Sequence, residues 1–353
     1  MLQKLKGEVM NLVKGGKKAL LVMASLAFLS SVNLYAKDFK PVIVIHGGTS
    51  GLGLTKEEFA KREVVMKESL KAGQKVLEAG GSSTDAVIAA IKVMEDSPEF
   101  NAGKGAVFTA DGYNELDASL MDGKTLNAGA IAMARTIKNP IEAAKVVMEK
   151  TPHTLIAGEG ADKLAKANGL EIVEQKYFYT EHRYKQLKEA QKSKEIFLDS
   201  DKAKAHLGLS TEPYLGTVGA IALDKNGNLA AGTSTGGTTN KMTGRIGDSP
   251  IIGAGNYANN NSVAVSCTGT GDIYIRVAAA HEVAALYKHK KLSIQKAAEE
   301  TIKEVAELGG TGGIISIDKN GKVGYAWTKD KLGMYHGEAR LGEEPKIFWP
   351  VAK

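Results

Sequence analysis

The chain has 353 residues, 43% of them apolar, and a formal net charge of +6 from 46 Lys and Arg against 40 Asp and Glu. A chain of this length and composition can bury a large core, which excludes a disordered protein. Cys267 is the only cysteine, so an intrachain disulfide is excluded, and its place after the apolar run Val263–Val265 favours a buried thiol over a reactive one. The seven histidines and this cysteine do not have the spacing of a zinc site.

Residues 1–36 have the basic, apolar, small order of a secretory signal, with lysines at 4, 6, 14, 17 and 18, an apolar run Ala19–Leu29 and a small residue, Ala36. We therefore expect cleavage near Ala36–Lys37 and an exported, periplasmic protein with no membrane attachment after that cut. An anchored N-terminal helix and a start codon placed too early are the alternatives. The apolar run is shorter than the roughly 20 residues of a membrane span.

The same segment accounts for most of the net charge. It carries five Lys and one Glu, so it holds +4 of the +6 charges and leaves 6 − 4 = +2 for the mature chain. A nearly neutral mature chain gives no electrostatic case for nucleic-acid binding.

In chain order, the mature part begins with a buried strand, Pro41–Ile45, which the glycine turn His46-Gly47-Gly48 is expected to end. Apolar periodicity predicts a helix over Lys56–Leu77, and the oxygens of Ser83, Thr84 and Asp85 are N-cap candidates for a second helix. Two further helices are predicted over residues 141–150 and 160–167.

The segment Lys176–Glu212 is crowded with charged residues. Its composition predicts a mobile, exposed connector over about 176–216. The alternative is a solvated helix over Tyr184–Ile196.

Two hairpins are predicted in the last third of the chain. Asn226-Gly227 joins Val218–Leu223 to Leu229–Ser234, and Asn320-Gly321 joins Ile314–Ile317 to Val323–Trp327. Between them, 4-3-4 spacing predicts one helix over Asp272–Lys288. Antiparallel strands together with several helices favour a sheet-on-sheet core with outer helical layers.

The chemistry centres on Gly216-Thr217 at the start of the first hairpin. Alone this pair indicates little, because threonine is a common strand residue and glycine often precedes a strand. If Asp224 faces Asn228 across the turn, however, Thr235 lies opposite Thr217. The register therefore predicts a second hydroxyl beside the first.

Two glycine-rich loops follow. In the loop containing Arg245-Ile246-Gly247-Asp248, the Arg fork could bind a carboxylate and the Asp an ammonium group, although a surface ion pair would look the same. The loop Ser266–Asp272 follows a strand and opens a helix, so its N–H groups could bind an anion or an oxyanion. Tyr274 stands where a dinucleotide fingerprint would need glycine.

Several motifs in order carry a family resemblance over residues 41–335. They are Ile45–Gly48, Phe100–Gly103, Glu115–Ala118, Met121–Gly123, Gly216–Ala220, Thr233–Gly237, Gly244–Pro250, Gly253–Ala258 and Ser266–Gly271. The chain resembles the plant-type (type III) L-asparaginases, the isoaspartyl peptidases. The resemblance implies an α+β fold, the four-layer αββα sandwich of N-terminal-nucleophile hydrolases. It also implies cleavage between Gly216 and Thr217 into an α subunit (37–216) and a β subunit (217–353) that form one domain.

Residue roles follow from the same resemblance. Thr217 is the nucleophile, Thr235 polarises it, and Thr268 with the N–H of Gly269 forms an oxyanion hole. The substrate contacts are assigned to Arg245, Ile246, Gly247, Asp248, Thr268, Gly269, Thr270 and Gly271. Catalysis needs no cofactor, and a structural sodium is expected on backbone carbonyls of Met94, Glu95, Ser97, Phe100, Ala102 and Lys104, although Lys104 stands where an uncharged residue is usual.

The implied activity is hydrolysis of β-aspartyl dipeptides and L-asparagine, small substrates whose cleavage releases L-aspartate. The resemblance further implies a dimer of αβ units. Glycosylasparaginase, which shares the fold but usually has an aspartate where Gly216 stands, is the alternative enzyme. A processed but inactive periplasmic protein that binds β-aspartyl compounds is the alternative from another class.

Overall fold

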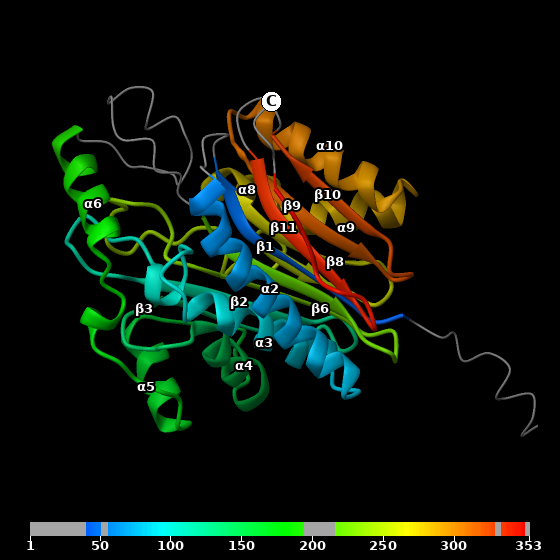
Figure 1. The fold of residues 1–353 in the computed structure, drawn as a ribbon, viewed down its shortest axis with the longest axis horizontal. Coiled ribbons are helices and arrows are strands. Elements are labelled where there is room, and N and C mark those ends of the chain that lie inside the picture. Colours follow the sequence, from blue (N-terminus) through cyan, green and yellow to red (C-terminus); the bar gives the residue numbers. More distant parts are fainter. Residues whose placement is uncertain (1–39, 51–55, 194–215, 329–332, 350–353) are drawn as a thin grey trace, which may run out of the picture. The chain divides into compact units, whose positions relative to one another are not determined.

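The computed structural model describes residues 40–50, 56–193, 216–328 and 333–349, all within one unit, Phe39–Lys353 (Figure 1). The predicted signal segment 1–36 and the second half of the predicted connector lie outside these residues. In the described part of the chain, no helix has the length and apolar content needed to cross a membrane.

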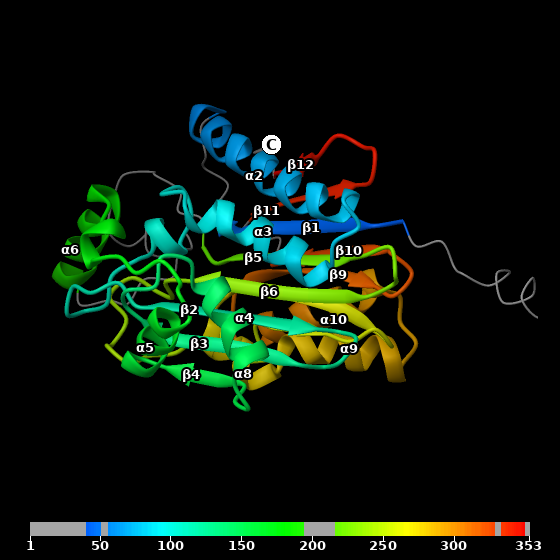
Figure 2. The same ribbon diagram turned by 90° about the horizontal axis from the view of Figure 1, so that it is seen from below.

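Two sheets form the centre of the fold. The larger has, in spatial order, β12 (Lys346–Phe348), β11 (Gly333–Arg340), β1 (Val42–Ser50), β5 (Val218–Leu223), β6 (Leu229–Thr235), β2 (Leu116–Asp122), β3 (Ala128–Ala134) and β4 (Leu155–Ala157). Figure 2 shows these strands side by side. All neighbours are antiparallel except β3 and β4. The smaller sheet has the order β10 (Val323–Trp327), β9 (Gly312–Asp318), β8 (Val263–Gly269) and β7 (Asn256–Ala258).

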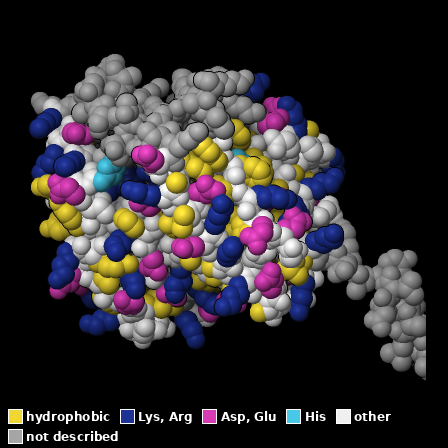
Figure 3. Space-filling model, viewed as in Figure 1, with side chains coloured by type: hydrophobic (Ala, Val, Ile, Leu, Met, Phe, Trp, Pro, Cys, Tyr) yellow, Lys and Arg dark blue, Asp and Glu magenta, His cyan; other side chains and the backbone are white. Residues whose placement is uncertain are grey.

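Helices cover the outer face of each sheet. Those packed on the larger sheet are α2 (Lys56–Glu78), α3 (Ser83–Glu95) and α4 (Pro140–Lys150), and those on the smaller one are α9 (Ala279–His289) and α10 (Ile294–Glu307). The other helices in the described residues are α5 (Glu159–Ala167), α6 (Glu181–Ser193), α8 (Gly271–Val277) and two short 3-10 turns, Gly103–Gly105 and Gln175–Tyr177. On the face seen in Figure 3, basic and acidic side chains are interspersed.

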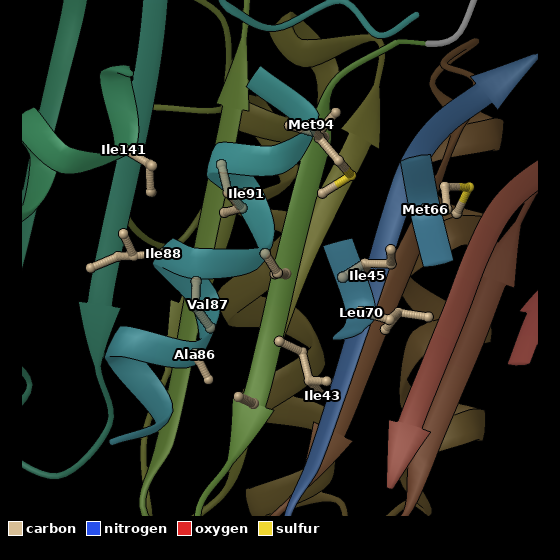
Figure 4. Close-up of a cluster of buried hydrophobic side chains, with 14 of the residues drawn as sticks. Ile43, Ile45, Met66, Leu70, Ala86, Val87, Ile88, Ile91, Met94 and Ile141 are labelled. Atoms are coloured by element: carbon tan, nitrogen blue, oxygen red, sulfur yellow. The ribbon is translucent and has the colours of Figure 1, made fainter. Parts of the chain in front are cut away.

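Strand alternation explains why four layers form. Successive side chains of a strand point to opposite faces, so β1 sends Ile43 and Ile45 toward the helical layer, where Figure 4 shows them beside Leu70 of α2. Val42 and Val44 point the other way and pack against residues of the smaller sheet. The far side of that sheet packs on α9 and α10 through a separate apolar cluster. The predicted α+β, αββα sandwich is confirmed.

The hairpin register is also as predicted. Asp224 N–H donates to the Asn228 carbonyl at 3.0 Å, and Val218 pairs with Ser234 in the β5–β6 ladder. Each predicted hairpin forms with a three-residue loop that ends on a glycine of positive φ, 78° at Gly227 and 81° at Gly321.

Three local expectations were wrong. β1 does not end at the glycines: it continues to Ser50 through a bulge between His46 and Thr49. The N-cap of α3 is Ser82, whose hydroxyl accepts from Asp85 N–H. The helix predicted over Asp272–Lys288 is two helices, because Ala278 has a left-handed φ of 52°, and the first turn of α9 donates to the Gly253 and Ala254 carbonyls.

The segment predicted as a connector is described only in its first half, as far as Ser193. Its described part contains α6, close to the alternative prediction of a helix. This helix is not merely solvated, since Leu187 and Ala190 are buried and Arg183 donates to the Gly105 carbonyl at 2.8 Å. The charged composition concealed a narrow buried stripe.

Candidate active site

Thr217 lies just before β5, and its hydroxyl donates to the Thr235 hydroxyl at 2.9 Å. The Thr235 oxygen also accepts from Gly237 N–H at 3.0 Å. The predicted pair of hydroxyls is therefore present, and a backbone donor orients the second one. Gly216 is buried against Gly48, where an added Cβ would come within 2.3 Å of the Gly216 nitrogen.

Asn101 supports this pair from the loop after α3. Its side-chain amide donates to the Gly237 carbonyl at 2.7 Å, and its backbone carbonyl accepts from Gly236 N–H at 3.1 Å. The side chain is 1% exposed. The sequence places this asparagine in a family motif but does not indicate its role. That role follows from its bond to Gly237, which is 136 residues away in the chain.

Arg245 and Asp248 converge on Gly271. A Cβ on Gly271 would lie 2.6 Å from Asp248 Oδ1 and 3.2 Å from Arg245 Nη2, so only glycine leaves this space open. The two residues do not form the surface ion pair that was the alternative: Arg245 Nη2 instead bonds Asp272 Oδ2 at 2.6 Å. Oδ2 of Asp248 is buried and has no hydrogen-bond partner in the described structure, so it can accept from a ligand.

Burial dominates the electrostatics of Asp248. It raises the pKa of this carboxyl to about 7, although the Arg245 guanidinium lowers it; Asp272 and Asp117 raise it further. A buried carboxyl with an open acceptor oxygen is suited to an ammonium group, whose charge would stabilise the ionised form.

Three charged residues near Arg245, namely Lys241, Asp117 and Glu115, were given no role from the sequence. Lys241 is fully buried and donates to the Glu115 carbonyl at 3.1 Å, and burial lowers its pKa while Asp117 and Glu115 raise it. Burial also raises the pKa of Asp117. The carboxylate of Glu115 accepts from Gly244 N–H at 3.2 Å, which fixes the start of the Arg245 loop.

Thr268 and Gly269 end β8 on the smaller sheet. Gly269 has a φ of +146°, and a Cβ there would lie 2.2 Å from the Thr311 carbonyl oxygen, so another residue would not fit. The Thr270 N–H donates to the Thr311 carbonyl at 2.8 Å.

The other predicted substrate contacts lie beside Arg245. A Cβ added to Gly247 would lie 2.9 Å from Arg245 Nη1, and Ile246 is half-buried. Cys267 is buried, as predicted.

The predicted sodium loop brings backbone carbonyls close to its two glycines. Cβ atoms on Gly103 and Gly105 would lie 2.3 Å from the Glu95 carbonyl and 2.1 Å from the Phe100 carbonyl. Lys104 places its ammonium 5.6 Å from the centre of the Tyr177 ring. Crowded carbonyls fit a hard monovalent cation, and the described residues contain no cluster of three or more His, Cys, Asp or Glu for a metal.

Comparisons with known proteins agree with this geometry. The family model described as asparaginase matches residues 39–346. The chain belongs to the asparaginase family. It is 48% identical to the isoaspartyl peptidase of Escherichia coli (87% of this chain, 95% of the relative) and 46% identical to that of Salmonella typhimurium (87% and 97%). The isoaspartyl peptidase/L-asparaginase of Mus musculus is 42% identical over 84% of this chain and 87% of the relative. The predicted family is confirmed, and none of these three relatives is named a glycosylasparaginase, which removes the support for that alternative.

Proposed function

We propose that the protein is a self-processing threonine amidohydrolase that hydrolyses β-aspartyl dipeptides and L-asparagine and releases L-aspartate. The observation that carries the proposal is the Thr217–Thr235 hydroxyl pair. Gly237 lies between this pair and Arg245 and contacts both. A Cβ on Gly237 would lie 3.3 Å from Arg245 Nη1, and its N–H bonds Thr235. The names of the relatives support the same substrates.

Self-processing comes first. The Thr217 hydroxyl attacks the Gly216 carbonyl carbon, the C–N bond breaks, and the acyl group moves from the Thr217 nitrogen to its oxygen. Water then hydrolyses this ester, which leaves a Gly216 carboxylate and a free Thr217 α-amine. That amine can act as base for its own hydroxyl, which is otherwise a weak nucleophile at neutral pH.

Substrate turnover uses the same hydroxyl. Arg245 would hold the α-carboxylate of the substrate and Asp248 its α-ammonium group, while Ile246, Gly247, Thr270 and Gly271 shape the pocket. Thr217 attacks the β-carbonyl, whose oxyanion accepts hydrogen bonds from Thr268 and the Gly269 N–H. The amine leaves as ammonia or an amino acid, and water frees aspartate from the β-aspartyl ester.

Four accompanying features are part of the proposal. Residues 1–36 act as a signal peptide for export to the periplasm, and the cut chain forms one domain of subunits 37–216 and 217–353. The carbonyls of Met94, Glu95, Ser97, Phe100, Ala102 and Lys104 would hold a structural sodium, which keeps this loop, and with it Asn101, in place. The working form is a dimer of αβ units.

The decisive experiment compares purified mature protein with a Thr217→Ala variant by intact mass and denaturing gel. We expect two fragments from the unmodified chain, one of them beginning at Thr217, and a single uncut chain from the variant. Release of aspartate from β-aspartyl-leucine and asparagine is measured on the same samples. A fully cut protein that binds but never releases aspartate would favour the binding-protein alternative, and an unmodified chain that stays uncut after long incubation would refute self-processing.

A further inference from the structure

Three polar side chains that have no part in the proposed chemistry meet beneath Thr217. They are His46 on β1, Thr233 on β6 and Ser266 on β8, and each is fully buried. Ser266 Oγ lies 2.9 Å from His46 Nε2 and 2.7 Å from Thr233 Oγ1. Ser266 Oγ also lies 3.3 Å from the Gly232 carbonyl oxygen, so it has partners on two strands of the larger sheet, β1 and β6. A buried polar group whose partners are all in place fixes the geometry around it.

This cluster crosses from one sheet to the other. His46 and Thr233 belong to the larger sheet, whereas Ser266 belongs to the smaller one. Gly219 leaves the space for it, since a Cβ there would lie 2.1 Å from Ser266 Oγ and 2.3 Å from His46 Nε2. A residue without a side chain at this point of β5 lets the hydrogen bonds form directly between the sheets.

The proposed active site is itself divided between the sheets. The nucleophile Thr217 and its partner Thr235 come from the larger sheet, and Thr268 and Gly269 come from β8 of the smaller one. Ser266 lies two residues before Thr268 on the same strand, so both side chains point toward the larger sheet. Apolar packing between the sheets is not directional, whereas these hydrogen bonds, like the one from Asn256 on β7 to Ser119 on β2, fix an offset between the sheets.

His46 does not act as a base here. Burial lowers its pKa to about 3; the Thr217 backbone counteracts this in part, and His336 lowers it further. The ring is therefore neutral under physiological conditions, and Ser266 can be its fixed partner at any working pH.

We propose that Ser266, held by His46 and Thr233, is a positioning residue that sets the distance between the nucleophile and the oxyanion donors. The proposal rests on the function proposed above. Misplacing a reacting group by about 1 Å can cost roughly 10²-fold in rate. Loss of the Ser266 hydroxyl should thus lower kcat, while KM should stay nearly unchanged because the Arg245–Asp248 pair is untouched.

The test compares Ser266→Ala with Ser69→Ala in the complete mature protein. Ser69 is equally buried, but its hydroxyl donates to the Ala90 carbonyl at 2.8 Å between α2 and α3, within one layer. Both variants lose one buried hydroxyl, and the melting temperature should fall further in Ser266→Ala because that change removes a hydrogen-bond partner from two buried side chains, His46 and Thr233. We expect kcat for β-aspartyl-leucine to fall about 10- to 100-fold in Ser266→Ala only, with KM within about twofold in both.

A second pair of variants, at Thr233, tests the same hydrogen bond if Ser266→Ala folds poorly. Thr233→Val keeps the shape of the side chain but removes the bond to Ser266, whereas Thr233→Ser keeps the hydroxyl and should restore kcat. Equal kcat values for Ser266→Ala and Ser69→Ala, or for Thr233→Val and Thr233→Ser, would overturn the proposal. An unmodified protein that releases no aspartate would instead overturn the proposed function.

Discussion

The buried carboxyl of Asp248 leads to a prediction about pH. Its pKa of about 7 in the empty site means that the carboxyl is ionised above pH 7 and neutral below it. A ligand ammonium group needs the ionised form, so below pH 7 binding must first remove a proton. One pKa unit corresponds to about 1.4 kcal/mol, and the dissociation constant of an ammonium ligand should therefore rise about tenfold per pH unit below 7.

The assay is calorimetric titration of the cut protein with L-aspartate, the proposed product, at pH 8, 7 and 6. We expect the affinity to weaken about tenfold between the first and last conditions. Succinate is the matched control, because it keeps both carboxylates but lacks the ammonium group. Protonation of the Thr217 α-amine, whose ordinary pKa is about 7.7–8.0, should change the affinity for both ligands alike. Parallel pH dependences for the two ligands would refute the assignment of Asp248.

Three further outcomes test other parts of the site. Thr235→Val keeps the strand shape but loses the 2.9 Å bond to Thr217, so kcat should fall about 10²-fold while Thr235→Ser stays active; equal rates would contradict a polarising role. Gly48→Ala would place a Cβ 2.3 Å from the Gly216 nitrogen and should slow self-cleavage on gels, unlike Gly112→Ala, which has a similar φ (+83° against +101°) but nothing within 4 Å. Arg245→Lys loses the planar fork, so KM should rise at least about tenfold at nearly constant kcat; a fall in kcat alone would show that Arg245 acts on the chemical step.

Much of the fold is local and could be predicted from the sequence. The Asn226-Gly227 turn determined the register of β5 and β6, and that register placed Thr235 beside Thr217 before any long-range contact was known. Helix periodicity located α2 and α4 to within a residue or two. Motif order was sufficient for the family, because each motif is a short stretch whose chemistry needs those residues together.

Errors arose where distant backbone decides a conformation. β1 continues past Gly47 and Gly48 because Thr49 and Ser50 pair with Met334 and Gly333 of β11 beyond the bulge. The break at Ala278 depends on carbonyls of Gly253 and Ala254, which no helical pattern reveals. The buried stripe of α6 could not be recognised from the sequence because charged residues surround it there.

The sequence by itself determined the residue types, the hairpin register and the order of the motifs, since these depend on neighbours in the chain. The tertiary structure decided which of these groups meet. It brings Arg245 and Asp248 together over Gly271, leaves Asp248 Oδ2 without a partner in the described structure, and joins Ser266 to His46 across 220 residues. Such contacts follow from the way one sheet packs on another, and side chains from separate strands determine that packing only when the whole chain is folded.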